Sequence, residues 1–206
     1  MHFYGLGARL KFTYLTEAEA FEYAVLEYPF SFWQWGAKCE QIPGKKDDLA
    51  KAVEHLPQVS NINLFADQSM TAFASHYYQS AQEMGYYGYE TEDFKGLLKA
   101  LPMQPHPHAA FTPNKMEVSF DGSLLEKTNQ WIETKGNQFI YINGALDTWS
   151  ATAVPPNDKV DALWFFMEGK DHGGARIRNM TEENREKLIV QLEKWLDLKI
   201  ERAKEE

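Results

Sequence analysis

Hydrophobic residues recur at helical spacing through the first half of the chain. Residues 16–28 begin with Thr16 and Glu19, the spacing of a capping box, and predict a helix. The same pattern predicts three further helices, at residues 47–56, 67–84 and 91–101. Gly85 is expected to cap the second of these at its C-terminus. Because proline donates no backbone hydrogen bond, helices are expected to end at Pro29, Pro57 and Pro102.

The pattern changes in the second half of the chain. Two short apolar runs, 138–143 and 162–167, are typical of strands. A helix is predicted before them at 124–134, and an amphipathic helix after them at 181–203. Alternating strands and helices indicate an α/β fold with a mostly parallel sheet. The segment 102–113 contains four prolines and is interpreted as a linker.

Composition and charge indicate a folded chain and argue against one class of partner. The chain has 206 residues, 44% of them hydrophobic, enough to bury a sizeable core, and a formal net charge of −9. The acidic balance argues against a nucleic-acid partner, because phosphate binding needs a basic surface.

Cys39 is the one cysteine of the sequence, so we expect no intrachain disulfide or cysteine zinc site, and we expect this thiol to be buried. No run of residues has the length and apolarity of a membrane span, and the first residues do not resemble a signal peptide.

Two titratable residues follow the two predicted strands. Asp147 comes after the first strand and His172 after the second, each close to glycine. The carboxyl ends of parallel strands meet at one edge of a sheet, and the order acid then histidine matches the chain order of α/β-hydrolase triads. Asp147 would orient the imidazole, and His172 would act as general base and acid. Alternatively, Asp147 caps the following helix and His172 is a loop residue.

A nucleophile for such a triad is missing. The sequence contains no G-x-S-x-G motif, the turn that presents a nucleophilic serine in α/β-hydrolases. Ser123, in "DGSLLEK", comes nearest but is better interpreted as a helix N-cap.

Two segments bear a family resemblance. "NGALDTWSA" resembles the acid loop of serine exopeptidases related to prolyl carboxypeptidase, and "YYQSAQEMGYYGY" resembles a second segment of that family. Thr148 and the full stretch are most similar to the bacterial secreted PS-10 or tripeptidyl aminopeptidase branch. The residues that match the second segment are Tyr78, Gln79, Glu83, Gly85 and Tyr87.

The resemblance implies an α/β-hydrolase with a mainly helical cap. Residues 1–125 would belong to the cap and 126–206 to the C-terminal part of the catalytic domain. It further implies catalytic Asp147 and His172, a nucleophilic serine on an N-terminal portion outside this chain, and a secreted or periplasmic location. Peptides would be the substrate, and no cofactor is implied. An N-terminal portion of the enzyme or a second copy would cover the incomplete sheet.

Substrate binding is expected in the helical region. Glu83, with Gln79 one turn before it, would hold the free ammonium group of a peptide, or else be a solvent-facing glutamate at the end of a helix. The aromatic residues either line an apolar pocket or belong to the core; they are Phe32, Trp33, Trp35, Tyr86 and Tyr87. His106 and His108 are spaced to share a metal ion, but without nearby acidic or cysteine partners we expect no metal site. Two alternatives remain: a non-catalytic helical module that binds a peptide or partner, and an esterase or lipase on the same scaffold.

Overall fold

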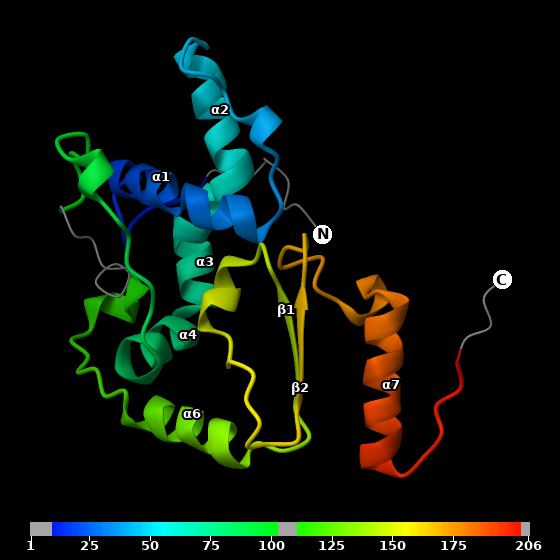
Figure 1. Cartoon of the computed structure of the whole chain (residues 1–206). Coiled ribbons are helices and arrows are strands. Elements are labelled where there is room, and N and C mark those ends of the chain that lie inside the picture. Colours follow the sequence, from blue (N-terminus) through cyan, green and yellow to red (C-terminus); the bar gives the residue numbers. More distant parts are fainter. Residues whose placement is uncertain (1–9, 103–110, 203–206) are drawn as a thin grey trace. The chain divides into compact units, whose positions relative to one another are not determined.

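The computed structural model describes residues 10–102 and 111–202 (Figure 1). The chain divides into two compact units, and each is described by itself. Within the described ranges, unit 1 contains residues 10–32 and 37–126, and unit 2 contains residues 33–36 and 127–202.

The first helix of unit 1, α1, spans Glu17–Gln34. Its predicted capping box is present: Thr16 N–H donates to Glu19 Oε2 at 2.7 Å, and Glu19 N–H donates to Thr16 Oγ1 at 3.2 Å. The predicted end at Pro29 is wrong, because the helix continues through the proline. Residues beyond the proline, among them Phe32, are buried, so packing compensates for the lost hydrogen bond.

The second helix, α2, spans Leu49–Ser60. Asp48 caps its N-terminus by accepting a hydrogen bond from Ala50 N–H at 3.2 Å. Pro57 lies inside the helix, so the predicted end there is also wrong. Short 3₁₀ turns flank α2, at Cys39–Gln41 and Ile62–Phe65.

The helix predicted for residues 67–84 is present in three pieces. α3 spans Asp67–Ala72, α4 spans Ala74–Gln79, and a π-helical turn spans Ser80–Met84. The break between α3 and α4 falls at Phe73, which is 49% exposed. Gly85 ends the π turn with φ 76°, a conformation that favours glycine, as the sequence predicted.

The helix predicted for residues 91–101 is not formed. Only a 3₁₀ turn, Glu92–Phe94, is present. The carboxylate of Glu22 on α1 instead accepts hydrogen bonds from three successive backbone N–H groups at 2.7–3.1 Å, those of Lys99, Ala100 and Leu101. These contacts satisfy N–H groups that a helix would have used internally. Most of the predicted linker, including His106 and His108, lies outside the described residues, and a 3₁₀ turn follows at Pro113–Lys115.

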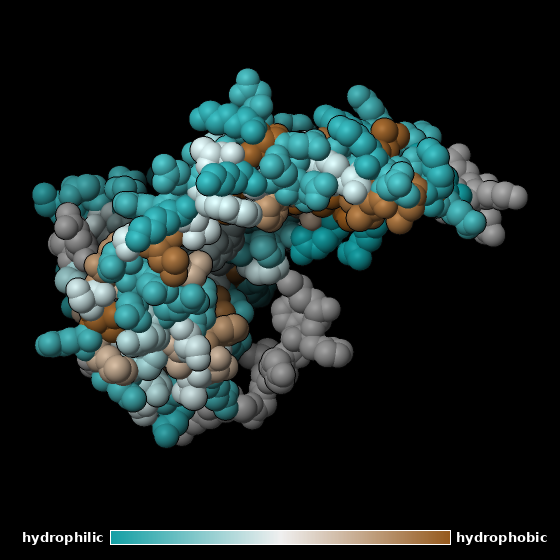
Figure 2. All heavy atoms as spheres, turned by 90° about the horizontal axis from the view of Figure 1, so that it is seen from below, coloured by the Kyte–Doolittle hydropathy of each residue, from teal (hydrophilic) through white to brown (hydrophobic). Residues whose placement is uncertain are grey.

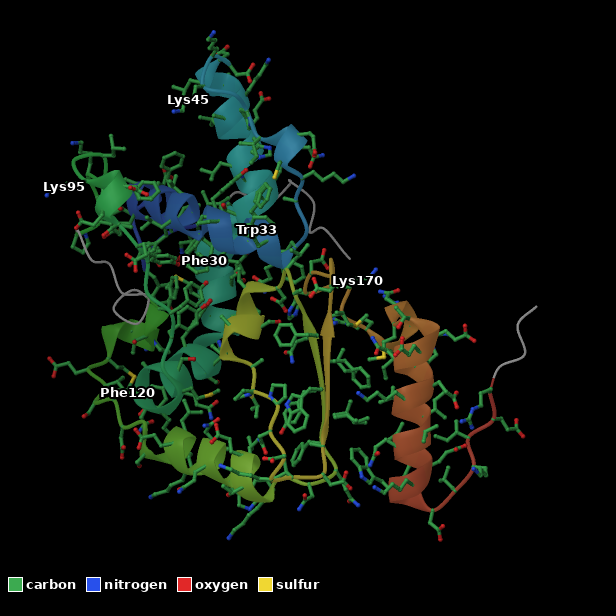
Figure 3. The ribbon with its side chains drawn as sticks, viewed as in Figure 1. Phe30, Trp33, Lys45, Lys95, Phe120 and Lys170 are labelled. Carbon is green, nitrogen blue, oxygen red and sulfur yellow. The ribbon has the colours of Figure 1, made fainter. Side chains whose placement is uncertain are left out.

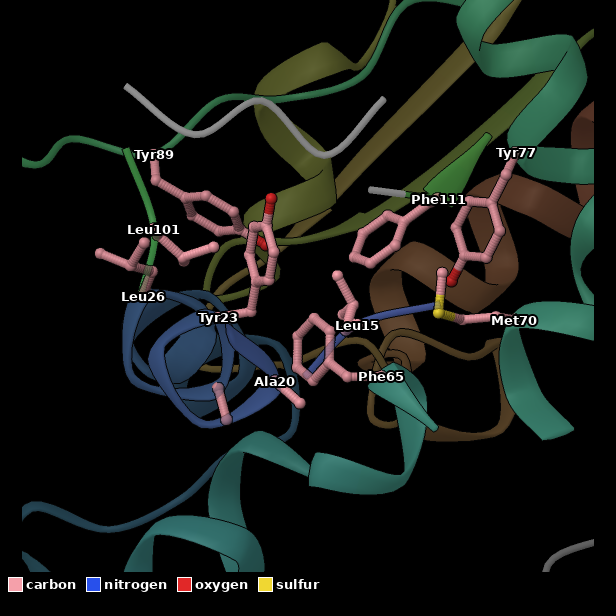
Figure 4. Packing of buried hydrophobic residues seen from close by; sticks show 11 residues of the cluster. Leu15, Ala20, Tyr23, Leu26, Phe65, Met70, Tyr77, Tyr89, Leu101 and Phe111 are labelled. Atoms are coloured by element: carbon pink, nitrogen blue, oxygen red, sulfur yellow. The ribbon is translucent and has the colours of Figure 1, made fainter. Parts of the chain in front are cut away.

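Aromatic residues dominate the core of unit 1 (Figure 4). Tyr23 of α1 stacks on Phe65 with ring centroids 5.8 Å apart, and Phe111 lies 4.9 Å from Tyr77. Burial raises the pKa of Tyr23 to about 12. Ala18, Phe21, Val25 and Tyr28 could share one face of α1, but none of them is buried. The buried residues of the helix are Ala20, Tyr23, Ala24, Leu26, Glu27, Ser31 and Phe32.

Unit 2 contains a two-stranded parallel sheet. Strand β1 spans Ile140–Gly144 and strand β2 spans Leu163–Met167, in register from Ile140↔Leu163 to Gly144↔Met167. Helix α6, Ser123–Lys135, leads into β1, and a 3₁₀ helix, Thr148–Thr152, follows it. After β2 come a 3₁₀ turn, Ile177–Asn179, and helix α7, Glu182–Leu196. The α/β character and the parallel pairing predicted from the sequence are therefore present.

The two faces of this sheet differ. α7 packs against one face (Figure 1), where Leu188 meets Phe165 and Met167 of β2 in a small core. The other face carries a row of aromatic rings in which Tyr141 stacks on Trp164 at 5.3 Å. On this face Phe139 and Phe166 are 40% and 50% exposed, and Trp131 of α6, whose ring lies edge-on to that of Phe139, is 49% exposed. Hydrophobic side chains are also visible among the hydrophilic residues of the surface in Figure 2.

Helix α7 ends before the predicted limit of residue 203. Asp197, with φ 51° in the left-handed region, terminates the helix. Beyond it, Arg202 turns back to bind the carboxylates of Glu186 and Glu193 on α7. Among the described residues, no helix is both long and apolar enough to cross a membrane.

Candidate active site

The loop after β1 holds Asp147 in place through its backbone. Asp147 N–H donates to Gly144 O at 3.1 Å, and Asp147 is the N-cap of the 3₁₀ helix that follows. Its Oδ1 accepts the backbone N–H of Trp149 at 3.1 Å. The capping role considered from the sequence is therefore present, and it occupies one of the two carboxylate oxygens.

The loop after β2 holds His172 through its backbone. Lys170 N–H donates to Met167 O at 3.2 Å and closes the turn after the strand. The N–H of His172 donates to Gln34 O at 3.0 Å, and its carbonyl oxygen accepts from Arg176 Nη1 at 2.8 Å. Both backbone polar groups of the histidine are thus satisfied within unit 2.

The two loops touch directly. Leu146 N–H donates to Lys170 O at 3.0 Å, just beyond the end of β2, where Figure 3 labels Lys170. Gly144 lies at the closest approach: a Cβ there would overlap Lys170 O and lie 2.8 Å from Asp171 O. Because both neighbours are backbone atoms, no side-chain movement relieves that clash. Only glycine permits the loops to approach this closely.

Asp147 and His172 meet where these loops touch. The Nδ1 of His172 lies 2.7 Å from Asp147 Oδ2. The side chain of Asp147 is 10% exposed and that of His172 is 41% exposed. A carboxylate only accepts hydrogen bonds, so Nδ1–H donates and the lone pair of the neutral ring is on Nε2. Within the part of the chain that the structure describes, Nε2 has no hydrogen-bond partner. This geometry suits a base that takes up a proton at Nε2.

An open pocket of about 480 Å³ lies beside Asp147 in unit 2. Trp33 and Phe166 provide aromatic surface to it, and the acid loop provides the rest. The loop residues that line it are Ala145, Leu146, Asp147, Thr148, Ser150 and Ala151. The pocket therefore combines an apolar lining with one carboxylate that already pairs with a histidine.

The three residues expected to bind substrate lie in unit 1. Gln79 is exposed at the end of α4, and Glu83 is half-buried in the π turn that follows it. Tyr87 is also half-buried, and its hydroxyl donates to Glu27 Oε2 at 2.7 Å. The hydroxyl of Tyr87 is thus hydrogen-bonded within unit 1, whereas the carboxylate of Glu83 has no hydrogen bond among the described residues.

Glu27 is a buried carboxyl group that sequence reasoning missed. It is 5% exposed and accepts hydrogen bonds from Tyr87 and from Tyr89, the latter at 2.9 Å. Burial raises the pKa of Glu27, although its hydrogen bonds with Tyr87, Tyr89 and Ser31 oppose that rise. Its position on α1, one helical turn after the buried Tyr23, is the feature of the sequence that could have indicated its burial.

Other expectations from the sequence have mixed outcomes. Cys39 is exposed, so the expected burial of its thiol is wrong. Of the aromatic cluster after Tyr28, Phe32 is buried, whereas Trp33 and Trp35 are 48% and 47% exposed. The cluster is therefore only partly core.

The fold and the site together define an α/β chain with an aspartate–histidine pair at the carboxyl ends of two parallel strands. The chain belongs to the PS-10 peptidase S37 family, whose model matches residues 8–205. The resemblance to PS-10 peptidases seen in the sequence is thereby confirmed.

The chain is similar to a prolyl tri/tetrapeptidyl aminopeptidase from Streptomyces mobaraensis, with 22% identity over 182 residues. The match covers 86% of this chain but only 38% of that enzyme, so the chain spans well under half the length of this relative. No solved structure matches the chain.

Proposed function

We propose that this chain supplies the acid and the base of a serine exopeptidase that releases short peptides from the N-terminus of its substrates. The observation that carries the proposal is the 2.7 Å contact between His172 Nδ1 and Asp147 Oδ2. Membership of a peptidase family and similarity to a prolyl tri/tetrapeptidyl aminopeptidase support the peptide substrate and a preference for proline. An α/β-hydrolase scaffold would account for the positions of both residues.

In this mechanism, His172 moves one proton twice. Its Nε2 takes the proton from a serine hydroxyl while the serine oxygen attacks the peptide carbonyl. The imidazolium then gives that proton to the leaving amine as the C–N bond breaks. Asp147 keeps Nδ1 protonated, holds the ring and stabilises its positive charge.

The nucleophilic serine and the oxyanion hole would come from a part of the protein outside residues 1–206. Two observations support this assignment: the sequence lacks G-x-S-x-G, and the chain spans 38% of the length of its relative. The exposed aromatic side chains of the sheet face, Phe139 and Phe166, together with Trp131 of α6, would then be covered by that N-terminal portion, or by a second copy of the chain. A stable monomer of the isolated chain in size-exclusion chromatography would count against such cover.

Substrate binding completes the proposal. Glu83 would hold the ammonium group of the peptide, with Gln79 and Tyr87 nearby in sequence shaping the site. The enzyme would act outside the cytoplasm, as the resemblance to secreted peptidases implies. A peptidase is better supported than a helical binding module or an esterase, because the family is a peptidase family.

The experiment uses the complete protein with peptide and ester substrates. His172→Ala should lower kcat by a factor on the order of 10⁶, and Asp147→Asn by about 10⁴. His55→Gln, which alters a histidine of unit 1 bonded to Tyr28, is the matched control and should retain activity. Full activity of the His172→Ala protein would end the proposal, and hydrolysis of esters without hydrolysis of peptides would favour the esterase alternative.

A further inference from the structure

One short segment of unit 2 supports the histidine loop from a distant part of the sequence. Gln34 O accepts the backbone N–H of His172 at 3.0 Å. Trp35 then places its indole against the imidazole, with ring centroids 5.2 Å apart and planes at 72°. Gly36 follows with φ 68°, and a Cβ there would overlap a carboxylate oxygen of Asp171. Three consecutive residues therefore approach the loop closely.

The histidine loop needs such support because it is rich in glycine. Gly169 adopts φ 65°, and Gly173 and Gly174 directly follow the histidine. Glycine loses more conformational freedom on folding than any other residue, so a loop of this composition is weakly ordered by itself. Contacts from outside the loop add to its internal hydrogen bonds, such as the one from Gly174 N–H to Asp171 Oδ1 at 2.6 Å.

The hydrogen bond to Asp147 alone leaves the imidazole underdetermined. It restrains Nδ1, but rotation about the Cα–Cβ and Cβ–Cγ bonds of His172 can still tilt the ring and carry Nδ1 away from Oδ2 for part of the time. Such a rotation changes the direction in which Nε2 points. An edge-to-face contact with a second aromatic ring restricts this rotation, because tilted aromatic pairs have a preferred geometry. Trp35 provides that contact in the structure.

We propose that Trp35 is a positioning residue that fixes the plane of the His172 imidazole and thus the direction of Nε2. Its catalytic consequence rests on the proposed function, whereas its effect on ring orientation does not. The indole is 47% exposed, so filling the core of unit 2 does not account for its position. Contact with the imidazole does.

The test is nitrogen NMR of the imidazole in the 206-residue chain. In the unaltered chain, the two ring nitrogens of neutral His172 should have well-separated shifts, as expected for a single tautomer with hydrogen on Nδ1. Trp35→Ala and Trp35→Leu should move the two shifts toward each other, because a freely turning ring keeps the Asp147 bond less of the time. Trp35→Phe should largely restore the separation, since it keeps an aromatic ring.

The control is Trp131→Ala, which removes an equally exposed indole of the same unit that contacts Phe139 and not the histidine. It should leave the imidazole shifts unchanged. Unchanged shifts in both Trp35→Ala and Trp35→Leu would overturn the proposal. Failure of both variants to fold would also overturn it, because Trp35 would then serve the stability of the unit.

The complete enzyme gives a second readout. Trp35→Leu should lower kcat by roughly tenfold to a hundredfold with little change in KM, as misplacement of a base does. If His172→Ala kept full activity while Trp35→Leu still altered the imidazole shifts, the proposed function would fail and the positioning role would stand. The two ideas are therefore separable.

Discussion

Replacing Glu27 with alanine removes the acceptor of two hydrogen bonds in unit 1, one buried and one half-buried. The hydroxyls of Tyr87 and Tyr89 both donate to Glu27 Oε2, at 2.7 and 2.9 Å. Glu27 is 5% exposed and Tyr89 is 9% exposed, so water reaches neither group easily. After the substitution, the hydroxyl of Tyr89 at least is left without its acceptor in a buried position.

The size of the effect follows from these hydrogen bonds. A buried hydroxyl without an acceptor costs about 1–3 kcal/mol, and loss of the hydrogen bond from the half-buried Tyr87 adds about 1 kcal/mol, so the penalty should be roughly 2–4 kcal/mol. The penalty also depends on pH. Burial raises the pKa of folded Glu27 above its unfolded value, so its contribution to stability is fully present below the unfolded pKa. That contribution is lost as the pH rises through the folded pKa, and Glu27→Ala should therefore cost more at pH 4 than at pH 8.

The assay is urea unfolding of the chain combined with native-state hydrogen exchange of the α1 amides, which reports on unit 1 locally. Glu17→Ala, at the exposed start of α1, is the control and should change stability by less than about 0.5 kcal/mol. A double-mutant cycle with Tyr89→Phe should give a coupling of about 1–2 kcal/mol. Additive single effects, or a Glu27→Ala penalty no larger than the control, would refute the reasoning.

Three further outcomes are expected in unit 2. Gly144→Ala should destabilise it by about 1–3 kcal/mol, because the new Cβ meets backbone carbonyl oxygens; Gly88→Ala, with open space around it, is the control in thermal unfolding. Leu188→Ala should cost about 2–5 kcal/mol in urea unfolding, since Leu188 is 2% exposed. Arg202 lowers the pKa of Glu193 to about 2. Carboxyl-carbon NMR should therefore show that the ion pair between Glu193 and Arg202 breaks only as the pH falls from about 4 toward 2. Arg202→Ala should raise the pKa of Glu193. An unshifted Glu193 titration in Arg202→Ala would contradict that assignment.

The sheet and the acid–base pair were within reach of sequence reasoning. Apolar runs of strand length predicted β1 and β2 to within two residues of each strand start. The rule that carboxyl ends of parallel strands share an edge then placed Asp147 and His172 together, and they lie 2.7 Å apart. Both inferences depend on local pattern and on geometry that every parallel sheet obeys. Their catalytic role stays a prediction.

The helical unit was harder to predict because long-range interactions override local signals there. The carboxylate of Glu22 accepts hydrogen bonds from the backbone N–H groups of residues 99–101. These bonds take the place of the internal hydrogen bonds of the helix that the local pattern predicted. Pro29 sits within a helix whose later residues are buried. The buried face of α1 includes Glu27, and a search for an apolar stripe passes over a carboxylate whose tyrosine partners lie about 60 positions away in sequence.

Two hydrogen bonds of His172, to Asp147 and to Gln34, differ in the number of residues in the chain loop between the two partners. The bond to Asp147 closes a loop of 25 residues, whereas the bond to Gln34 closes a loop that contains most of the protein. Loop-closure entropy rises with length, so the first bond is cheaper to form than the second. During folding, the histidine would therefore find its carboxylate early and acquire its tryptophan neighbour late. Refolding kinetics followed by Trp35 fluorescence should accordingly lag behind formation of the parallel strands.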